Sequence, residues 1–111
     1  MENLKLMTDD MLVTLYLKGN NSAFDVLMER HKDRLFNYIY FLVHSREVAE
    51  DIFQETFVKA IVTMQQGRYQ KDGKFGAWIT RIAHNLVIDQ FRVERNENLI
   101  SNDETDFDIL N

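Results

Sequence analysis

The residues best suited to chemistry lie in the last third of the chain, where polar and basic side chains recur at helical spacing. Six positions within residues 75–95 lie three or four residues apart and therefore fall on one side of a helix. They are Arg81, His84, Asn85, Ile88, Arg92 and Arg95. Arginine binds phosphate through a planar pair of donors, and asparagine can both donate to and accept from a base edge. This side of the predicted helix therefore has the chemistry to lie along nucleic acid.

The segment before this helix adds a second set of candidate contacts. Residues 67–74, Gly-Arg-Tyr-Gln-Lys-Asp-Gly-Lys, form a polar loop in which Arg68, Lys71 and Lys74 surround Tyr69. Positive charge beside an aromatic ring suits single-stranded nucleic acid, because the charge attracts the backbone and the ring stacks on a base. Trp78 follows the loop, either as a core residue that anchors the helix or as a partly exposed ring that stacks on a base.

A different surface is predicted on the helix spanning residues 46–66. Its apolar stripe, which includes Phe53 and Phe57, faces the core. The opposite side carries two carboxylates, an amide and two valines: Asp51, Gln54, Glu55, Val58 and Val62. This mixture suits docking against a basic helical partner, with the valines as apolar contacts. The alternative is an ordinary solvent-exposed face with two incidental valines.

Catalysis and metal binding find little support in the sequence. His31, His44 and His84 stand in no helical metal-ligand pairing, and the absence of cysteine excludes cysteine-rich metal sites, disulfides and cysteine nucleophiles. We expect His31 at the edge of the core with its ring bonded to a neighbour, and His44 at the end of a helix. The sequence predicts neither an enzyme nor a cofactor.

Four helical segments must position these surfaces. There is no proline, and glycines and capping residues divide the chain. We expect one helix from the Thr8 cap to Gly19, a second from a cap at Asn21 or Ser22 to about Val43, a third from a Ser45 cap to residue 66, and a fourth from residue 75 to residue 93 or 95. The predicted fold is all-α, a compact bundle of about four helices.

Charge divides the chain in a way that its net value of −5 conceals. Residues 67–95 hold six basic and three acidic side chains, whereas residues 96–111 hold five acidic and no basic ones. We predict one helical domain over residues 1–95 and an acidic linker or tail over 96–111. No apolar run approaches the length of a membrane span, and the start of the chain lacks the pattern of a signal peptide, so we expect a cytoplasmic protein. No heptad seam is visible, and we expect a monomer.

Two strings of residues resemble a known family. Residues 48–60, Val-Ala-Glu-Asp-Ile-Phe-Gln-Glu-Thr-Phe-Val-Lys-Ala, resemble the polymerase-binding segment of bacterial sigma factors. Residues 75–92, Phe-Gly-Ala-Trp-Ile-Thr-Arg-Ile-Ala-His-Asn-Leu-Val-Ile-Asp-Gln-Phe-Arg, resemble their promoter-melting segment. The Thr8-Asp-Asp opening of the first helix and the Asn-Ser-Ala-Phe start of the second also resemble region 2 of the extracytoplasmic-function group of sigma factors. The resemblance runs from Thr8 to Arg95.

The resemblance implies partners for both surfaces. Asp51, Gln54 and Glu55 match the residues that grip the clamp helices of the largest subunit of RNA polymerase. The loop over residues 67–74 matches the site where the family captures a base flipped from the minus-ten promoter element. The helix after it contacts the non-template strand, through Trp78, Arg81, Asn85 and Arg92. An anti-sigma factor is implied as a further partner.

Departures from the family pattern leave some points open. Ile61 stands where the family often has an aromatic residue, and His84 where many members have a longer basic side chain, so promoter preference stays open. The family normally continues into a helix-turn-helix domain, and we expect the acidic tail to lead towards it in a longer chain. The alternative hypothesis is a helical protein-interaction adaptor without DNA contact, in which Arg81, Arg92 and Arg95 are merely solvated.

Overall fold

The computed structural model describes residues 3–102, and all regular elements in this range are helices. They are the 3-10 helix η1 (Leu4–Leu6) and the α-helices α1 (Asp9–Leu17), α2 (Asn21–Val43), α3 (Arg46–Gln65) and α4 (Phe75–Asn102). The predicted all-α bundle of about four helices is confirmed. The 3-10 helix was not predicted.

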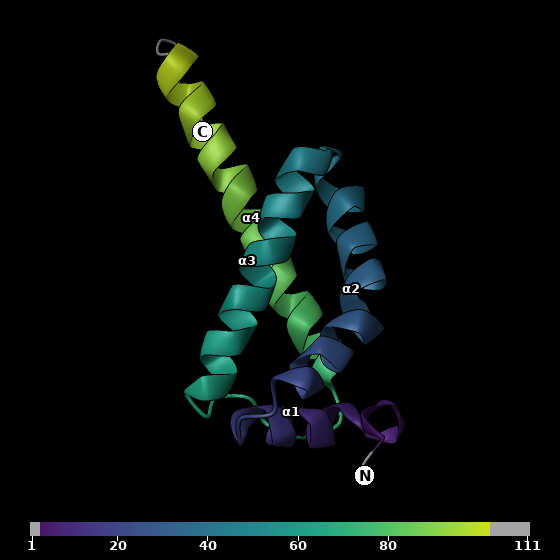
Figure 1. The fold of residues 1–111 in the computed structure, drawn as a ribbon. Coiled ribbons are helices and arrows are strands. Elements are labelled where there is room, and N and C mark those ends of the chain that lie inside the picture. The colour runs from purple at the N-terminus through teal and green to yellow at the C-terminus, as the bar shows by residue number, and fades with distance from the viewer. Residues whose placement is uncertain (1–2, 103–111) are drawn as a thin grey trace.

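The helices pack as a hairpin crossed by a third long helix (Figure 1). α2 and α3 form an antiparallel hairpin, and α4 packs against both of them. α1 runs across the end of the bundle at which α3 ends and α4 begins. This arrangement places α1 beside the loop that joins α3 to α4. None of the helices within residues 3–102 is long and apolar enough to cross a membrane.

Side-chain caps fix where three of the helices begin. The Thr8 hydroxyl accepts a hydrogen bond from the Met11 amide at 3.1 Å, and the Ser45 hydroxyl accepts one from the Val48 amide at 3.2 Å, both as predicted. The cap of α2 was predicted one or two residues too late. The side chain of Asn20 accepts from the Ala23 amide at 3.2 Å, because the helix already begins at the next residue.

The end of α4 also differs from the prediction. The helix was expected to stop at residue 93 or 95, but it continues to Asn102. Residues 96–102 contain neither proline nor glycine, so nothing in their backbone interrupts the helix. The rest of the predicted tail, residues 103–111, lies outside the described residues. The domain boundary at residue 95 stays a prediction.

The core is formed by apolar side chains from all four α-helices. Its buried members are Leu12, Val13, Ala23, Phe24, Leu27, Leu35, Ile39, Ala49, Ile52, Phe57, Ala60, Met64, Phe75, Ile79, Ala83, Leu86 and Val87. Phe57 meets Phe24 edge to face, with ring centroids 6.0 Å apart, and so joins α3 to α2. The buried hydroxyl of Thr56 donates to the Ile52 carbonyl at 2.7 Å. The packing of Phe57 against Phe24 helps to fix the rotation of α3 and hence the side that it presents to solvent.

Candidate protein- and nucleic-acid-binding surfaces

The five residues predicted on the outer side of α3 are all exposed. The two valines are the unusual members, because Val58 is 59% exposed and Val62 is 46% exposed. Among the side chains of residues 3–95, no ion pair involves Asp51 or Glu55. Exposed apolar side chains beside carboxylates without basic partners form a surface suited to a basic partner protein. We call Asp51, Gln54, Glu55, Val58 and Val62 the α3 face.

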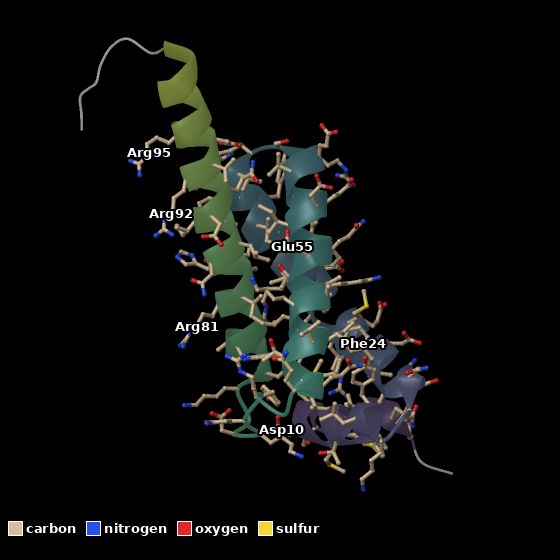
Figure 2. The ribbon with its side chains drawn as sticks, turned by 90° about the vertical axis from the view of Figure 1, so that its left-hand side faces the viewer. Asp10, Phe24, Glu55, Arg81, Arg92 and Arg95 are labelled. Atoms are coloured by element: carbon tan, nitrogen blue, oxygen red, sulfur yellow. The ribbon has the colours of Figure 1, made fainter. Side chains whose placement is uncertain are left out.

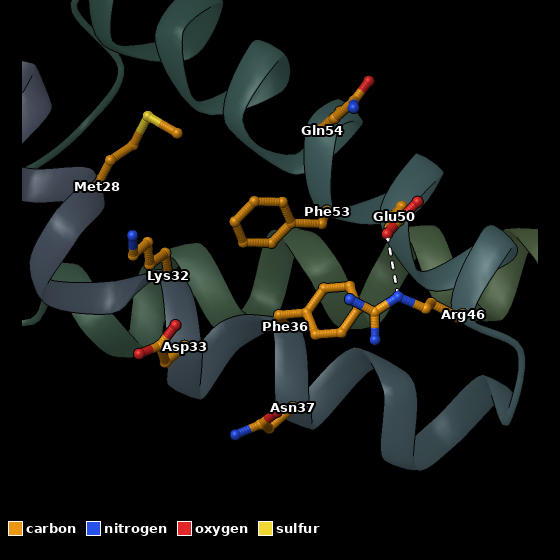
Figure 3. Close-up of a pocket in the computed structure, with 9 residues that line it drawn as sticks. All are labelled: Met28, Lys32, Asp33, Phe36, Asn37, Arg46, Glu50, Phe53 and Gln54. Atoms are coloured by element: carbon orange, nitrogen blue, oxygen red, sulfur yellow. Dashed lines mark ion pairs between the residues drawn. The ribbon is translucent and has the colours of Figure 1, made fainter.

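A hollow that the sequence did not indicate adjoins this face (Figure 3). It lies between α2 and α3, has a volume of about 780 Å³, and includes Gln54 in its lining. The rings of Phe36 and Phe53 meet edge to face there, with centroids 5.8 Å apart. At one end Arg46 lies 5.7 Å from the centroid of the Phe36 ring and pairs with Glu50 at 3.3 Å. Phe53 was predicted in the core stripe of its helix, but both phenylalanines are only half-buried.

The outer side of α4 is basic and largely exposed. Arg81, Arg92 and Arg95 project from the same side of the helix, as Figure 2 shows. Asn85 is exposed among them, as predicted. Ile88 differs, because it is half-buried although helical projection places it opposite the core.

Two of the outer residues of α4 have partners within the chain. Arg92 approaches Asp89 of the same helix at 3.6 Å, a long contact between two exposed side chains that contributes little to stability. His84 Nδ1 lies 2.9 Å from the hydroxyl of Tyr38 on α2. The second contact joins α4 to α2 at the surface.

The loop between α3 and α4 is held against α1 by one carboxylate. The Tyr69 hydroxyl donates to Asp10 Oδ1 at 2.6 Å, and the Gly73 amide donates to Asp10 Oδ2 at 2.8 Å. Gly73 has a φ of 81°, a conformation that favours glycine. Lys71 Nζ donates to the Thr14 hydroxyl at 3.0 Å. Sequence reasoning missed this role of Asp10, which was noted only as part of the Thr8-Asp-Asp opening of the first helix.

Three aromatic rings pack where the loop enters α4. The Tyr69 ring lies 4.6 Å from that of Trp78 and 5.7 Å from that of Phe75, between centroids. Burial, the hydrogen bond to Asp10 and nearby carboxylates raise the pKa of the Tyr69 hydroxyl well above its ordinary value. Tyr69 is therefore half-buried and anchored, and is not the freely exposed platform that we expected. Trp78 packs in this cluster, as the first alternative predicted, and it remains partly exposed. Its stacking on a base stays a prediction.

A hollow of about 250 Å³ opens beside these rings. It brings together predicted residues of the loop and of α4, and it adds three that were not predicted, Gln70, Asp72 and Ala77. The predicted members are Arg68, Tyr69, Lys74, Trp78 and Arg81. Lys71 points instead to α1, and Asn85, Ile88 and Arg92 lie further along α4. The hollow thus has an aromatic wall and a basic rim.

The histidines take part in structural contacts. His31 Nε2 lies 2.9 Å from Asp9 Oδ2, as predicted for a ring bonded to a neighbour, and Arg30 also binds Asp9 at 3.0 Å. His44 ends α2 in a left-handed conformation with a φ of 58°. Within the described part of the chain, no group of three or more His, Cys, Asp or Glu side chains is arranged to hold a metal ion.

Comparison with known proteins identifies the family that shares these features. Residues 27–97 match the family described as Sigma-70 region 2. The sigma factor BldN of Streptomyces coelicolor is 39% identical over 77 residues, which are 69% of this chain and 29% of that protein. SigW of Bacillus subtilis is 35% identical over 78 residues, which are 70% of this chain and 41% of that protein.

Both relatives are described as extracytoplasmic-function RNA polymerase sigma factors. A sigma-E factor of the same description from Haemophilus influenzae is 28% identical over 107 residues, which are 93% of this chain and 55% of that protein. The chain thus spans less than half the length of BldN and of SigW. No solved structure matches it significantly.

Proposed function

Because the chain belongs to the extracytoplasmic-function group of bacterial sigma factors through its region 2 domain, we propose that it binds core RNA polymerase and recognises and melts the minus-ten promoter element. It acts in transcription initiation in the cytoplasm and is not an enzyme. The observation that carries this proposal is that two neighbouring helices expose chemically different surfaces. One is the α3 face with its acids and valines, and the other is the basic side of α4 with the loop before it.

The α3 face is the polymerase contact in this proposal. The carboxylates of Asp51 and Glu55 would pair with basic residues on the clamp helices of the largest subunit, and Gln54 would bond between them. Val58 and Val62 would bury apolar surface that is exposed in the free chain. The same exposed surface would serve an anti-sigma factor that keeps the chain inactive, since covering it excludes polymerase.

The loop and α4 are the DNA contact. Opening a duplex costs a few kcal/mol for each base removed from its stack, and holding the extruded base offsets that cost. The hollow beside Tyr69 and Trp78 supplies an aromatic wall for such a base, and Lys74 and Arg81 supply charge for the flanking phosphates. Arg92 continues the phosphate contact along α4, and Asn85 offers an amide to a base edge. In this proposal, binding energy alone opens the promoter, and no chemical step is catalysed by the chain.

Charge reversal on the α3 face tests the polymerase contact. Asp51→Lys combined with Glu55→Lys should weaken binding to core polymerase by more than tenfold, because losing one partner of a charge pair buried on binding costs on the order of 2–5 kcal/mol. Helical content and thermal unfolding should hardly change, since both side chains are exposed. The matched control reverses Asp25 and Glu29, two exposed acids of α2. Unchanged polymerase binding by the α3 variant would refute this contact.

Substitutions on α4 separate the two kinds of DNA contact. Arg92→Ala should weaken binding to all sequences equally and reduce its salt dependence, because a phosphate contact is lost. Asn85→Ala should instead reduce opening at the preferred minus-ten sequence and narrow its advantage over a mutated one. Permanganate footprinting on both templates measures this advantage. If Asn85→Ala leaves it intact, base recognition belongs to the loop alone.

A further inference from the structure

A second groove opens on the other side of Arg81 from the hollow beside Tyr69 and Trp78. It lies between α2 and α4 and has a volume of about 590 Å³. Gly76, Ala77 and Thr80 contribute to its lining from α4. These small side chains leave space where longer ones would fill the gap between the two helices. The groove shares Ala77 and Arg81 with the hollow, so the two depressions are neighbours on the surface.

Side chains that can donate hydrogen bonds line the groove, and no acidic side chain does. Arg34 and Tyr38 line it from α2, and Arg81 and His84 from α4. The Tyr38 hydroxyl and His84 Nδ1 are 2.9 Å apart, which holds these two side chains across the groove. Of the side chains placed by the structure, none forms an ion pair with Arg34 or Arg81, and both arginines are exposed. In a chain of net charge −5, such a groove attracts an anion with several oxygens.

The other large hollow, between α2 and α3, provides a contrast. It is lined by Asp33 and Glu50 as well as by Lys32 and Arg46, so its charges compensate one another. The groove between α2 and α4 has no such compensation, and its arginines are free to form forked hydrogen bonds to phosphate. The groove is widely open to solvent, which suits an extended strand better than a small enclosed ligand.

We propose that the groove between α2 and α4 binds the sugar-phosphate backbone of single-stranded DNA, with Arg34 as the phosphate contact from α2. This inference rests on the proposed function, since it extends the same strand beyond the base held beside Tyr69 and Trp78. Arg81 then lies at the junction, between the nucleotide in the hollow and the nucleotides that follow it. α2 thereby becomes part of the DNA-binding surface, which neither the sequence nor the family resemblance indicated.

The test compares oligonucleotides of two lengths bound to the complex of this chain with core polymerase. The short one spans the minus-ten element, and the long ones add three nucleotides at one end or the other. For the wild type, extension at one end should raise affinity measured by fluorescence anisotropy. Arg34→Ala should abolish this gain and lower the salt slope by roughly 0.7, the value for one phosphate contact on a single strand. Affinity for the short oligonucleotide should stay within about twofold.

Two further variants complete the design. Arg34→Lys keeps the positive charge but loses the paired donors of the guanidinium, so it should recover part of the affinity gained from the longer oligonucleotide. Lys18→Ala removes one exposed positive charge from α1 and should leave both affinities unchanged. If Arg34→Ala behaves like Lys18→Ala on every oligonucleotide while Arg81→Ala weakens binding, the groove inference is overturned and the proposed function stands. If the wild-type complex binds no better than polymerase alone, both fail.

Discussion

The carboxylate of Asp10 should hold the loop between α3 and α4, the proposed DNA contact, in place, and removing it should measurably lower the stability of the fold. It accepts two hydrogen bonds, from the Tyr69 hydroxyl at 2.6 Å and from the Gly73 amide at 2.8 Å. Hydrogen bonds to charged groups contribute about 1.5–3 kcal/mol each, and partial exposure places these towards the lower end. Asp10→Ala should therefore lower the free energy of unfolding by about 3 kcal/mol. Tyr69→Phe, which removes one of the two bonds, should lower it by about 1.5 kcal/mol.

A double-mutant cycle tests whether the bond itself carries this energy. The two substitutions together should cost about 1 kcal/mol less than the sum of their separate costs, because each removes the same hydrogen bond. Urea unfolding followed by circular dichroism gives the free energies. Trp78 is the single tryptophan and lies 4.6 Å from the Tyr69 ring, so its fluorescence reports the loop directly. Asp10→Asn is the control for shape, since it keeps an acceptor oxygen and loses the charge.

The result that would refute the reasoning is additivity. If the two costs add within about 0.3 kcal/mol, the hydrogen bond contributes no coupling and the loop is held by other contacts. If the bond is confirmed, Asp10→Ala should also reduce promoter opening while leaving affinity for core polymerase unchanged, since the α3 face does not touch the loop tether. A loss of both activities would indicate general unfolding.

Three other predictions follow from the packing and from the titration of Tyr69. Phe57→Ala should lower the free energy of unfolding by roughly 3–5 kcal/mol in urea titrations, because the ring is buried against Phe24 and its loss leaves a cavity; a mild effect would contradict the orientation of α3. Thr8→Ala should cost about 1 kcal/mol through loss of the α1 cap, measured in the same way, with Thr63→Ala in the interior of α3 as the non-capping control. The pKa of Tyr69 is raised in the folded state, so its contribution to stability is intact below about pH 10, the ordinary tyrosine value. That contribution is lost as the pH rises towards the folded-state pKa. The free energy of unfolding measured against pH should show this fall in the wild type and less of it in Tyr69→Phe.

Local patterns in the sequence were sufficient to predict the four α-helices and the residues on both exposed surfaces. Apolar residues at spacings of three and four fix which side of α3 is buried, so the exposure of Asp51, Glu55 and Val58 followed without knowledge of the fold. The caps at Thr8 and Ser45 are equally local, because each bonds an amide three residues ahead.

Features that depend on the packing of distant elements were missed. The Asp10 tether spans 59 residues of sequence to Tyr69, and nothing near Asp10 in the chain indicates it. The groove lined by Arg34 requires α2 and α4 to lie side by side, and the hollow beside Phe36 requires a particular crossing of α2 and α3. The continuation of α4 to Asn102 was missed for a different reason. Residues 96–111 are acidic and lack helical periodicity, which predicts a tail, but residues 96–102 contain no backbone breaker that would end the helix.

The central claim, that this chain directs core polymerase to single-stranded promoter DNA, is tested most directly by one titration. A fluorescent single strand carrying the minus-ten element is titrated with core polymerase, with the chain alone, and with both together, at several salt concentrations. We predict that the combination binds more tightly than either component, that binding weakens as salt rises, and that a mutated minus-ten sequence loses the gain. If the chain binds polymerase but adds no affinity for this strand, it is an adaptor without DNA contact and the claim is contradicted.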